Sequence, residues 1–286
     1  MMLYSLLFII PIAWVSATEF ADQPCAARSI PNKSVVCVCT ADYCDTVIRE
    51  TPVSGQAFTY SSSLSGERFN KTSAALTAYD DCVEATYDVK LALDRSKKYQ
   101  TIQGFGAAVT DAAAINWMDL TDTNLRNYFV ESYCGSSGLQ YSMLRVPIGG
   151  TAFSTRAYAY SMTPENDTDL CDFELSAEDI DYKIPLIKAC MEASDTSIKI
   201  LASLWSPPAW MKSNNAYTGI GWLKEEYYQT LADYIYKFLE AYEAECIPTW
   251  GITTTNEPSN GIMYSDNPNS LGWTVDQMGN WLSNYL

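Results

Sequence analysis

The residues best suited to chemistry in this sequence stand in the stretch 251–261, GITTTNEPSNG. Its β-branched residues predict a strand, and Pro258 ends that strand because proline cannot continue the hydrogen-bond ladder. Glu257 would then lie at the carboxyl end of the strand. In a barrel of alternating strands and helices, this end carries the catalytic residues. The alternative is that Glu257 belongs only to a turn.

Most glycoside hydrolases use two carboxyl groups: one protonates the leaving oxygen, and the other attacks the sugar or activates water. Glu257 can be the first of these groups, and Asn256 beside it can donate a hydrogen bond to the 2-hydroxyl of a sugar. The second carboxylate should follow another strand. Asp111 is the only strand-end candidate in the sequence, and a role as a helix cap explains Asp111 equally well.

Two tryptophans, Trp205 and Trp210, flank Ser-Pro-Pro-Ala where another strand is expected to end. The face of a tryptophan ring can bind the apolar C–H side of a sugar, while polar groups around it contact the hydroxyls. Burial in the core is the alternative for each ring. The position directly at the strand exit makes Trp205 the candidate for a sugar contact.

The composition excludes several classes of mechanism. The 286 residues contain no histidine, which rules out Ser-His-Asp and Cys-His catalysis and zinc bound by histidine in this chain. Acid–base chemistry must therefore come from carboxylates, Tyr, Lys or Cys. The net charge of −16 argues against a nucleic-acid partner, because phosphate binding requires a basic surface. No cofactor and no metal site is implied.

The first 17 residues are mostly apolar and end in Val15-Ser16-Ala17, which predicts a secretory signal peptide with the mature chain starting near Thr18. An uncleaved anchor is the alternative, because the usual basic start is missing. No other segment is apolar enough to span a bilayer. A secretory route places the protein in a lumenal compartment or outside the cell. Acceptor sequons for glycosylation begin at Asn32, Asn70 and Asn166.

Four of the nine cysteines crowd into residues 18–50: Cys25, Cys37, Cys39 and Cys44. In an oxidising compartment this cluster predicts a disulfide-rich subdomain, whereas in the cytosol it would suggest zinc. The spacing alone leaves three possible pairings open. Because nine is odd, at least one cysteine is unpaired or forms an intermolecular bond.

The remaining sequence divides into two segments. Residues 51–99 are rich in Ser, Thr and Tyr, and the alternation over 84–93 predicts a strand of an antiparallel sheet. In residues 100–286, strands are expected over 101–110, 140–148, 197–204 and 249–255, with helices after Asp111 and over 180–193, 224–244 and 273–286. Such alternation predicts a parallel sheet, and four strand–helix units are half of the eight in a (β/α)8 barrel. A doubly wound sheet is the alternative, but GFGAAVTD is a poor phosphate-binding turn.

Several motifs occur in one order: PCAARSIPNKSVVCVCTADYCD, GFGAAVTDAAAIN, LRVPIGGTAFSTRAYAY, KIPLIKAC, SLWSPPAWMK and NEPSNG. From about Cys25 to the end, the sequence resembles the glucosylceramidases of glycoside hydrolase family 30. The resemblance implies a (β/α)8 TIM barrel with a β-sandwich and a small disulfide-rich N-terminal subdomain. It also implies a retaining mechanism on the β-glucosyl linkage of glucosylceramide, and disulfides Cys25–Cys37 and Cys39–Cys44.

The resemblance implies a role for each residue that matches a family motif. Glu257 would be the acid/base, Asn256 would bind the sugar near its 2-hydroxyl, and Trp205 would line the glucose pocket. The resemblance gives Arg145 an electrostatic role beside the carboxylates, with a structural ion pair as the alternative. Asp111 is expected to cap a helix. Family members act on lipid at a membrane surface, and so strongly acidic a chain would need protonation or an activator protein to approach anionic lipid.

The sequence departs from the family pattern in two places. The family places its nucleophilic Glu on the seventh barrel strand, so residues 100–286 are expected to be the first half of the barrel, without the nucleophile. Ala152 stands where the family has an Asp that accepts hydrogen bonds from glucose. Losing one buried acceptor weakens the binding of the sugar by about 1–3 kcal/mol. Ala152 keeps two alternatives open: a non-catalytic paralogue that binds a sugar or glycolipid, and a hydrolase of a different β-glycoside.

Overall fold

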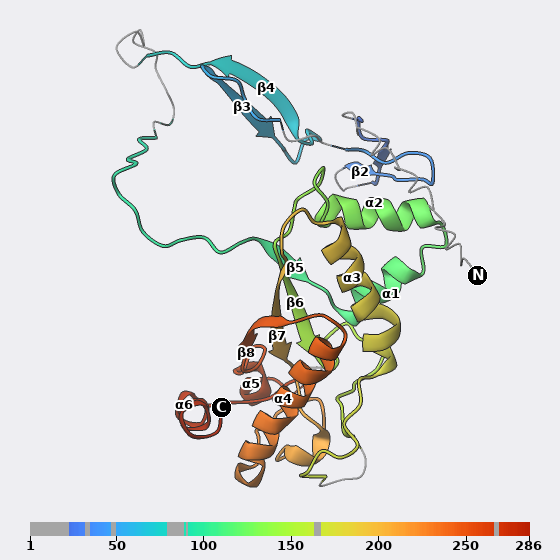
Figure 1. The fold of residues 1–286 in the computed structure, drawn as a ribbon, viewed down its shortest axis with the longest axis vertical. Helices are drawn as coiled ribbons and strands as arrows, with labels where there is room; N and C mark the ends of the chain where they lie inside the picture. The colour runs from blue at the N-terminus through green and yellow to red at the C-terminus, as the bar shows by residue number, and fades with distance from the viewer. Residues whose placement is uncertain are drawn as a thin grey trace, which may run out of the picture.

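The structure is a computed structural model that describes residues 23–31, 35–46, 50–78, 89, 91–162, 167–265 and 269–286. Its central element is a four-stranded parallel sheet in the order β5-β6-β7-β8 (Figure 1). The strands are β5 (Gly106–Ala108), β6 (Met143–Ile148), β7 (Lys199–Leu204) and β8 (Thr249–Thr253). The strand order follows the chain, as expected for consecutive units of a (β/α)8 barrel.

The two central strands, β6 and β7, share one burial pattern, in which the carboxyl-terminal half is fully buried. All four strands of the sheet are shorter than the sequence predicts. The strand expected over 101–110 covers only Gly106–Ala108, where β6 provides a hydrogen-bonding partner. The strand expected over 140–148 begins at Met143, because Gln140 has a left-handed backbone (φ +54°) that interrupts an extended chain.

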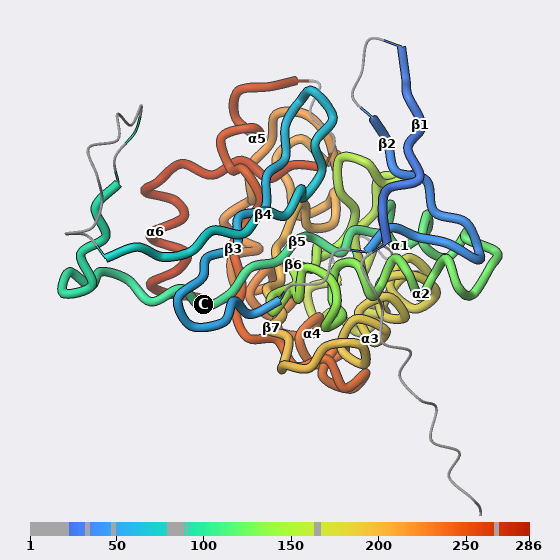
Figure 2. The backbone as a smooth tube through the Cα atoms, turned by 90° about the horizontal axis from the view of Figure 1, so that it is seen from above, coloured from blue at the N-terminus to red at the C-terminus, as the bar shows by residue number. Residues whose placement is uncertain are grey.

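The helices α1 to α4 gather on one side of the sheet (Figures 1 and 2). They are α1 (Asp111–Met118), α2 (Thr123–Tyr133), α3 (Ile184–Ala193) and α4 (Tyr228–Ala244), and the chain also contains α5 (Asn260–Met263) and α6 (Val275–Asn284). Helix α4 packs through the apolar stripe that its periodicity predicts, with Leu231, Ile235 and Phe238 fully buried. The buried side chains of α3, α4 and the sheet form one continuous core.

A π-helical turn, Glu178–Lys183, precedes α3 and carries a buried ion pair that no pattern in the sequence predicts. Lys183 Nζ lies 2.6 Å from Asp179 Oδ1, and both side chains are buried. The same oxygen accepts hydrogen bonds from the hydroxyls of Tyr160 (2.9 Å) and Tyr242 (2.7 Å). Lys183 also donates to the carbonyl of Pro147 in β6, so this cluster ties the turn to the carboxyl end of the sheet.

The N-terminal part contains two antiparallel pairs: β1 (Ala27–Ser29) with β2 (Val35–Cys37), and β3 (Gln56–Ser61) with β4 (Asn70–Ala75). The β3–β4 hairpin lies at the end of the molecule opposite α4 (Figure 1). The strand expected over 84–93 falls largely outside the described residues, and residues 89 and 91–93 form no strand. Among the sequons, Asn70 is exposed in β4, while Asn32 and Asn166 lie outside the described residues.

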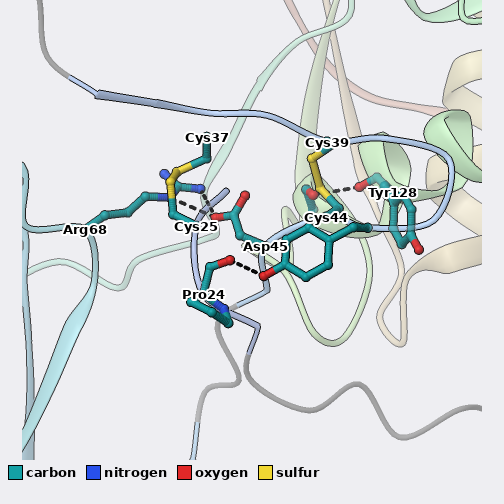
Figure 3. The surroundings of a disulfide bond; sticks show 10 residues. Pro24, Cys25, Cys37, Cys39, Cys44, Asp45, Arg68 and Tyr128 are labelled. Atoms are coloured by element: carbon teal, nitrogen blue, oxygen red, sulfur yellow. Dashed lines mark hydrogen bonds and ion pairs between the residues drawn. A yellow bond between two sulfur atoms is a disulfide. The ribbon is translucent and has the colours of Figure 1, made fainter. Parts of the chain in front are cut away.

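The structure contains the disulfides Cys25–Cys37 and Cys39–Cys44 (Figure 3). An ion pair between Arg68 and Asp45 (2.7 Å) lies beside them and ties this region to the loop before β4. Although Asp45 lies near two cysteines, both sulfurs belong to a disulfide and are not thiolates that could bind a metal.

A third disulfide, Cys134–Cys190, joins the end of α2 to α3. Its two cysteines are 56 residues apart, and no local pattern predicts the pairing because it depends on how the two helices pack. Cys171 and Cys246 are unpaired and exposed.

The expected signal peptide, residues 1–17, lies outside the described residues. In the part of the chain that is described, no helix combines the length and the apolar character needed to cross a membrane.

Candidate active site

The carboxyl end of β8 presents the Asn-Glu pair predicted from the sequence. Strand β8 ends at Thr253, and the backbone N–H of Asn256 donates to the carbonyl of Leu204 at the end of β7 (2.6 Å). Glu257 follows with an exposed side chain and a left-handed backbone (φ +44°). A non-glycine residue adopts this conformation at an energetic cost, and such residues concentrate at functional sites.

Arg145 on β6 reaches across the sheet and orients Asn256. Its Nη2 donates to Asn256 Oδ1 (2.9 Å) and to Ser203 Oγ (2.8 Å) on β7. The Thr253 hydroxyl on β8 in turn donates to Ser203 Oγ (2.5 Å). Because Arg145 occupies the amide oxygen of Asn256, the amide nitrogen is left as the group that can donate to a ligand.

Trp205 packs against the same arginine. The ring is buried, and the Arg145 guanidinium lies over it at 4.5 Å from the ring centroid. This distance is within the range of a cation–π interaction, which fixes the plane of the ring against Arg145. The other tryptophan, Trp210, is a core residue that donates to the carbonyl of Ser161 and packs edge-on against Tyr227.

The charges of the site influence one another. Burial lowers the pKa of the Arg145 guanidinium from its ordinary value, and the nearby Glu257 carboxylate opposes this effect. An arginine nevertheless keeps its charge in proteins. Arg145 is thus a fixed positive charge near an exposed carboxylate. Among the described residues, Arg145 forms no direct ion pair with a carboxylate.

The expectation that Asp111 caps helix α1 is wrong. The N-cap is Thr110, which has an extended backbone and accepts a hydrogen bond from the N–H of Ala113 (3.1 Å). Asp111 is the first residue inside the helix and is buried. Its Oδ1 accepts from Ser154 Oγ (2.9 Å), while its buried Oδ2 has no protein partner. A buried acceptor without a partner requires an explanation, and a bound hydroxyl would provide one.

The loop after β6 carries Ala152 and Phe153, and both are exposed. The loop begins with Gly149, whose φ of +78° suits glycine, and Gly150, where a Cβ would lie 2.5 Å from the side-chain amide of Asn269. Ser154 closes the turn by accepting from the N–H of Thr151 (2.7 Å) and by donating to Asp111. The loop therefore reaches the site through Ser154, not through Ala152.

Two further residues of the site were not predicted. Ser203 bridges Arg145 and Thr253 across three strands, and a single serine near the end of an apolar strand gives no signal of this role. Asn260 donates its side-chain N–H to Glu257 Oε2 (2.5 Å). Its position three residues after Glu257 matches the spacing of a helical turn, and this spacing was available in the sequence.

A comparison with models of protein families matches residues 102–285 to the glycosyl hydrolase family 30 TIM-barrel domain. The chain belongs to glycosyl hydrolase family 30. This result confirms the resemblance drawn from the motifs and the α/β barrel fold. The matched residues of this family 30 chain include the whole parallel sheet, together with Arg145, Trp205, Asn256 and Glu257.

The curated relatives of the family 30 chain include proteins named as glucosylceramidases. It is 38% identical over 256 residues to putative glucosylceramidase 3 of Caenorhabditis elegans, covering 88% of this chain and 48% of the relative. It is 36% identical over 272 residues to the lysosomal acid glucosylceramidase of Mus musculus, covering 93% and 52%. An endo-1,6-beta-D-glucanase of Neurospora crassa is 33% identical over 178 residues, covering 60% and 36%.

Among solved structures, SrfJ from Salmonella typhimurium matches with a TM-score of 0.60 and 29% identity, over 65% of this chain and 40% of that structure. The endo-β1,6-glucanase BT3312 matches with a TM-score of 0.60 and 28% identity, over 68% and 42%. The two glucosylceramidases match most of the family 30 chain. The chain spans only about half of their length.

Proposed function

We propose that this chain forms the acid/base half of a retaining β-glucosidase that hydrolyses glucosylceramide to glucose and ceramide. The observation that carries the proposal is the end of β8, where Arg145 orients Asn256 and an exposed glutamate follows directly. Membership of a glycosidase family and the glucosylceramidase names of the relatives support the choice of reaction and substrate.

In the proposed reaction, the carboxylic acid of Glu257 gives its proton to the glycosidic oxygen as the bond between this oxygen and the anomeric carbon breaks. Ceramide leaves as an alcohol, and a second carboxylate forms a bond to the anomeric carbon. Glu257, now ionised, takes a proton from water as the water attacks that carbon, which releases glucose and frees the second carboxylate.

The other side chains have supporting roles in the proposal. The Asn256 amide donates to the sugar 2-hydroxyl, and the Trp205 ring packs against the sugar. Asp111, whose Oδ2 has no protein partner, accepts a hydrogen bond from another hydroxyl. The second carboxylate must lie about 5–5.5 Å from Glu257 in a retaining enzyme. None of the described residues is assigned to that role, and the proposal places it in the remainder of an eight-stranded barrel.

Location and partners belong to the same proposal. Three disulfides are typical of a protein of the secretory pathway, and one relative is named as lysosomal. A lysosomal or secreted glucosylceramidase would meet its substrate at a membrane lipid surface. An activator protein would help a chain of net charge −16 to approach anionic lipid.

A second candidate substrate is a different β-glycoside. It is favoured by the relatives named as endo-1,6-beta-D-glucanases and by the alanine at position 152. A non-catalytic sugar-binding paralogue is also compatible with Ala152, although the oriented Asn256 and the adjacent Glu257 argue against it.

The test incubates the protein that carries this sequence with glucosylceramide vesicles and, separately, with a β-1,6-linked glucan, and measures the glucose released. Release from glucosylceramide only is the expected result, and Glu257→Gln should abolish it. Release from the glucan only would support the second candidate. Tight binding of glucosylceramide without release of glucose would support the non-catalytic paralogue.

A further inference from the structure

The side chain of Asn260 is bound to the carboxylate of Glu257. Its Nδ2 donates to Glu257 Oε2 at 2.5 Å, and its backbone N–H donates to the carbonyl of Glu257 at 2.9 Å. Asn260 therefore contacts both the side chain and the backbone of the candidate acid/base. The backbone contact closes the turn in which Glu257 adopts its left-handed conformation.

Glu257 needs such a contact because its side chain is exposed. An exposed glutamate samples several rotamers, and confining it to one costs side-chain entropy. Proton transfer requires the carboxyl group to lie within hydrogen-bond reach of the glycosidic oxygen. A neighbour that confines the carboxyl group before the substrate arrives would make the transfer faster.

An amide suits this task in both halves of the proposed reaction. Its N–H₂ group donates to an ionised carboxylate, and its carbonyl oxygen accepts from a protonated carboxylic acid. A retaining acid/base is protonated before the first half of the reaction and ionised before the second. By turning its amide, Asn260 can form a hydrogen bond with either form of Glu257.

We propose that Asn260 is a positioning residue that holds the carboxyl group of Glu257 in line with the glycosidic oxygen in both protonation states. The inference rests on the proposed acid/base function of Glu257. It extends that function to a residue outside the Asn256–Glu257 pair.

Removing the Asn260 side chain should leave helix α5 in place, because backbone contacts hold this helix. The carbonyl of Gly261 accepts from the N–H of Gly221 (2.9 Å), and a Cβ on Gly261 would lie 2.2 Å from the backbone nitrogen of Gly272. The N-cap of α5 is Ser259, which makes no side-chain cap. The effect of Asn260→Ala should thus be confined to Glu257.

The kinetic test compares kcat/KM of wild type and Asn260→Ala, in the protein that carries this sequence, on two β-glucosides. Phenyl β-glucoside has a poor leaving group that needs the proton, while 2,4-dinitrophenyl β-glucoside has a leaving group that departs without it. General acid catalysis accelerates such a reaction by about 10²–10⁴. If Asn260 no longer positions the acid, kcat/KM on the phenyl substrate should fall about tenfold. The dinitrophenyl substrate should change by less than about twofold.

Two variants provide controls. Ser259→Ala alters the neighbouring residue and should leave both substrates unchanged. Asn260→Asp keeps the size of the side chain but loses the N–H, so it should show at least the loss of Asn260→Ala. An equal loss on both substrates, or no loss on either, would overturn the proposal.

If the wild type hydrolyses neither substrate, the proposed function fails, and NMR on the 286-residue chain decides the role of Asn260 separately. Its side-chain amide signal is assigned by its disappearance in Asn260→Asp. If Asn260 holds the carboxyl group, Glu257→Ala should move this signal towards the position of a solvated amide. An unchanged signal would refute the contact itself.

Discussion

The orientation of Glu257 depends on its neighbours, because its side chain is exposed and its backbone is left-handed. Arg145 supplies a fixed positive charge and orients the adjacent Asn256, and Asn260 contacts the carboxylate itself. Strand β8 already ends at Thr253, so Glu257 lies in the turn that follows the strand. The chemistry proposed for this site therefore rests on a few short contacts.

Arg145→Lys tests the contact to Asn256. An ammonium group does not reproduce the planar fork with which arginine binds several acceptors. Hydrogen bonds to charged groups contribute about 1.5–3 kcal/mol, so kcat/KM on a β-glucoside should fall by about ten- to a hundredfold. The control is Arg95→Lys, which replaces an exposed arginine and should have no effect. Equal activity of the two variants would exclude a role for the guanidinium fork.

Lys212 gives a prediction for the pH dependence of stability. Burial lowers the pKa of this lysine from 10.5 to about 8, and its ammonium group donates to the carbonyl of Tyr217 (3.0 Å). Above about pH 8 the folded chain loses this proton while the unfolded chain keeps it. The free energy of unfolding should therefore rise with pH, by about 1–2 kcal/mol between about pH 8 and about pH 9.5.

Lys212→Met should remove this rise, as measured by urea unfolding at both pH values. Burial raises the pKa of Tyr160 and Tyr234 above the ordinary value of 10.0, which lowers stability slightly as the pH approaches 10. Both tyrosines are present in wild type and variant, so their contribution cancels in the difference between the two proteins. The same rise in wild type and variant would contradict the assignment to Lys212.

The parallel sheet brings the site together, since Arg145, Ser203 and Thr253 come from three successive strands. The sequence predicted the strand order and the strand-end residues, because β-branched runs and polar strand ends are local patterns. It could not predict which side chains would meet, because this depends on the register between strands. The prediction that Asp111 caps α1 is wrong because Thr110 is an equally good cap, and only the backbone conformation of Thr110 decides between them.

The turn before α3 gives a prediction for a secondary-structure element. Asp179→Asn would leave the Lys183 charge buried without a carboxylate, and breaking such a pair costs about 3–5 kcal/mol. The control is Glu245→Gln, which breaks the exposed pair with Lys188 and should cost at most about 1 kcal/mol. Urea unfolding measures both values, and similar losses for the two variants would contradict the importance of the buried cluster.

For the whole molecule, the described residues form four strands in barrel order, and β5 and β8 each pair with a single neighbour. Family membership follows from residues 102–285, while the relatives are about twice as long as this chain. The sequence predicted this architecture through its motifs. The pairing of Cys134 with Cys190 depends on how α2 packs against α3, for which no local pattern exists.

The purified 286-residue chain should release no glucose from a β-glucoside, because retaining hydrolysis requires a second carboxylate and none of the described residues is assigned to that role. The measurement is an assay with glucosylceramide and with 2,4-dinitrophenyl β-glucoside at the highest soluble concentration. If this chain released glucose and Glu257→Gln abolished the release, the second carboxylate would have to lie within the 286 residues, which would contradict the prediction.

The central claim is that Glu257 is the acid/base, and one product analysis tests it most directly. Glu257→Ala, in the protein that carries this sequence, is incubated with 2,4-dinitrophenyl β-glucoside and sodium azide. The leaving group needs no proton, and azide needs no base to attack the glycosyl-enzyme. We predict that azide restores the turnover and that β-glucosyl azide accumulates. Formation of α-glucosyl azide would instead identify Glu257 as the nucleophile, and no effect of azide would contradict its role as the acid/base.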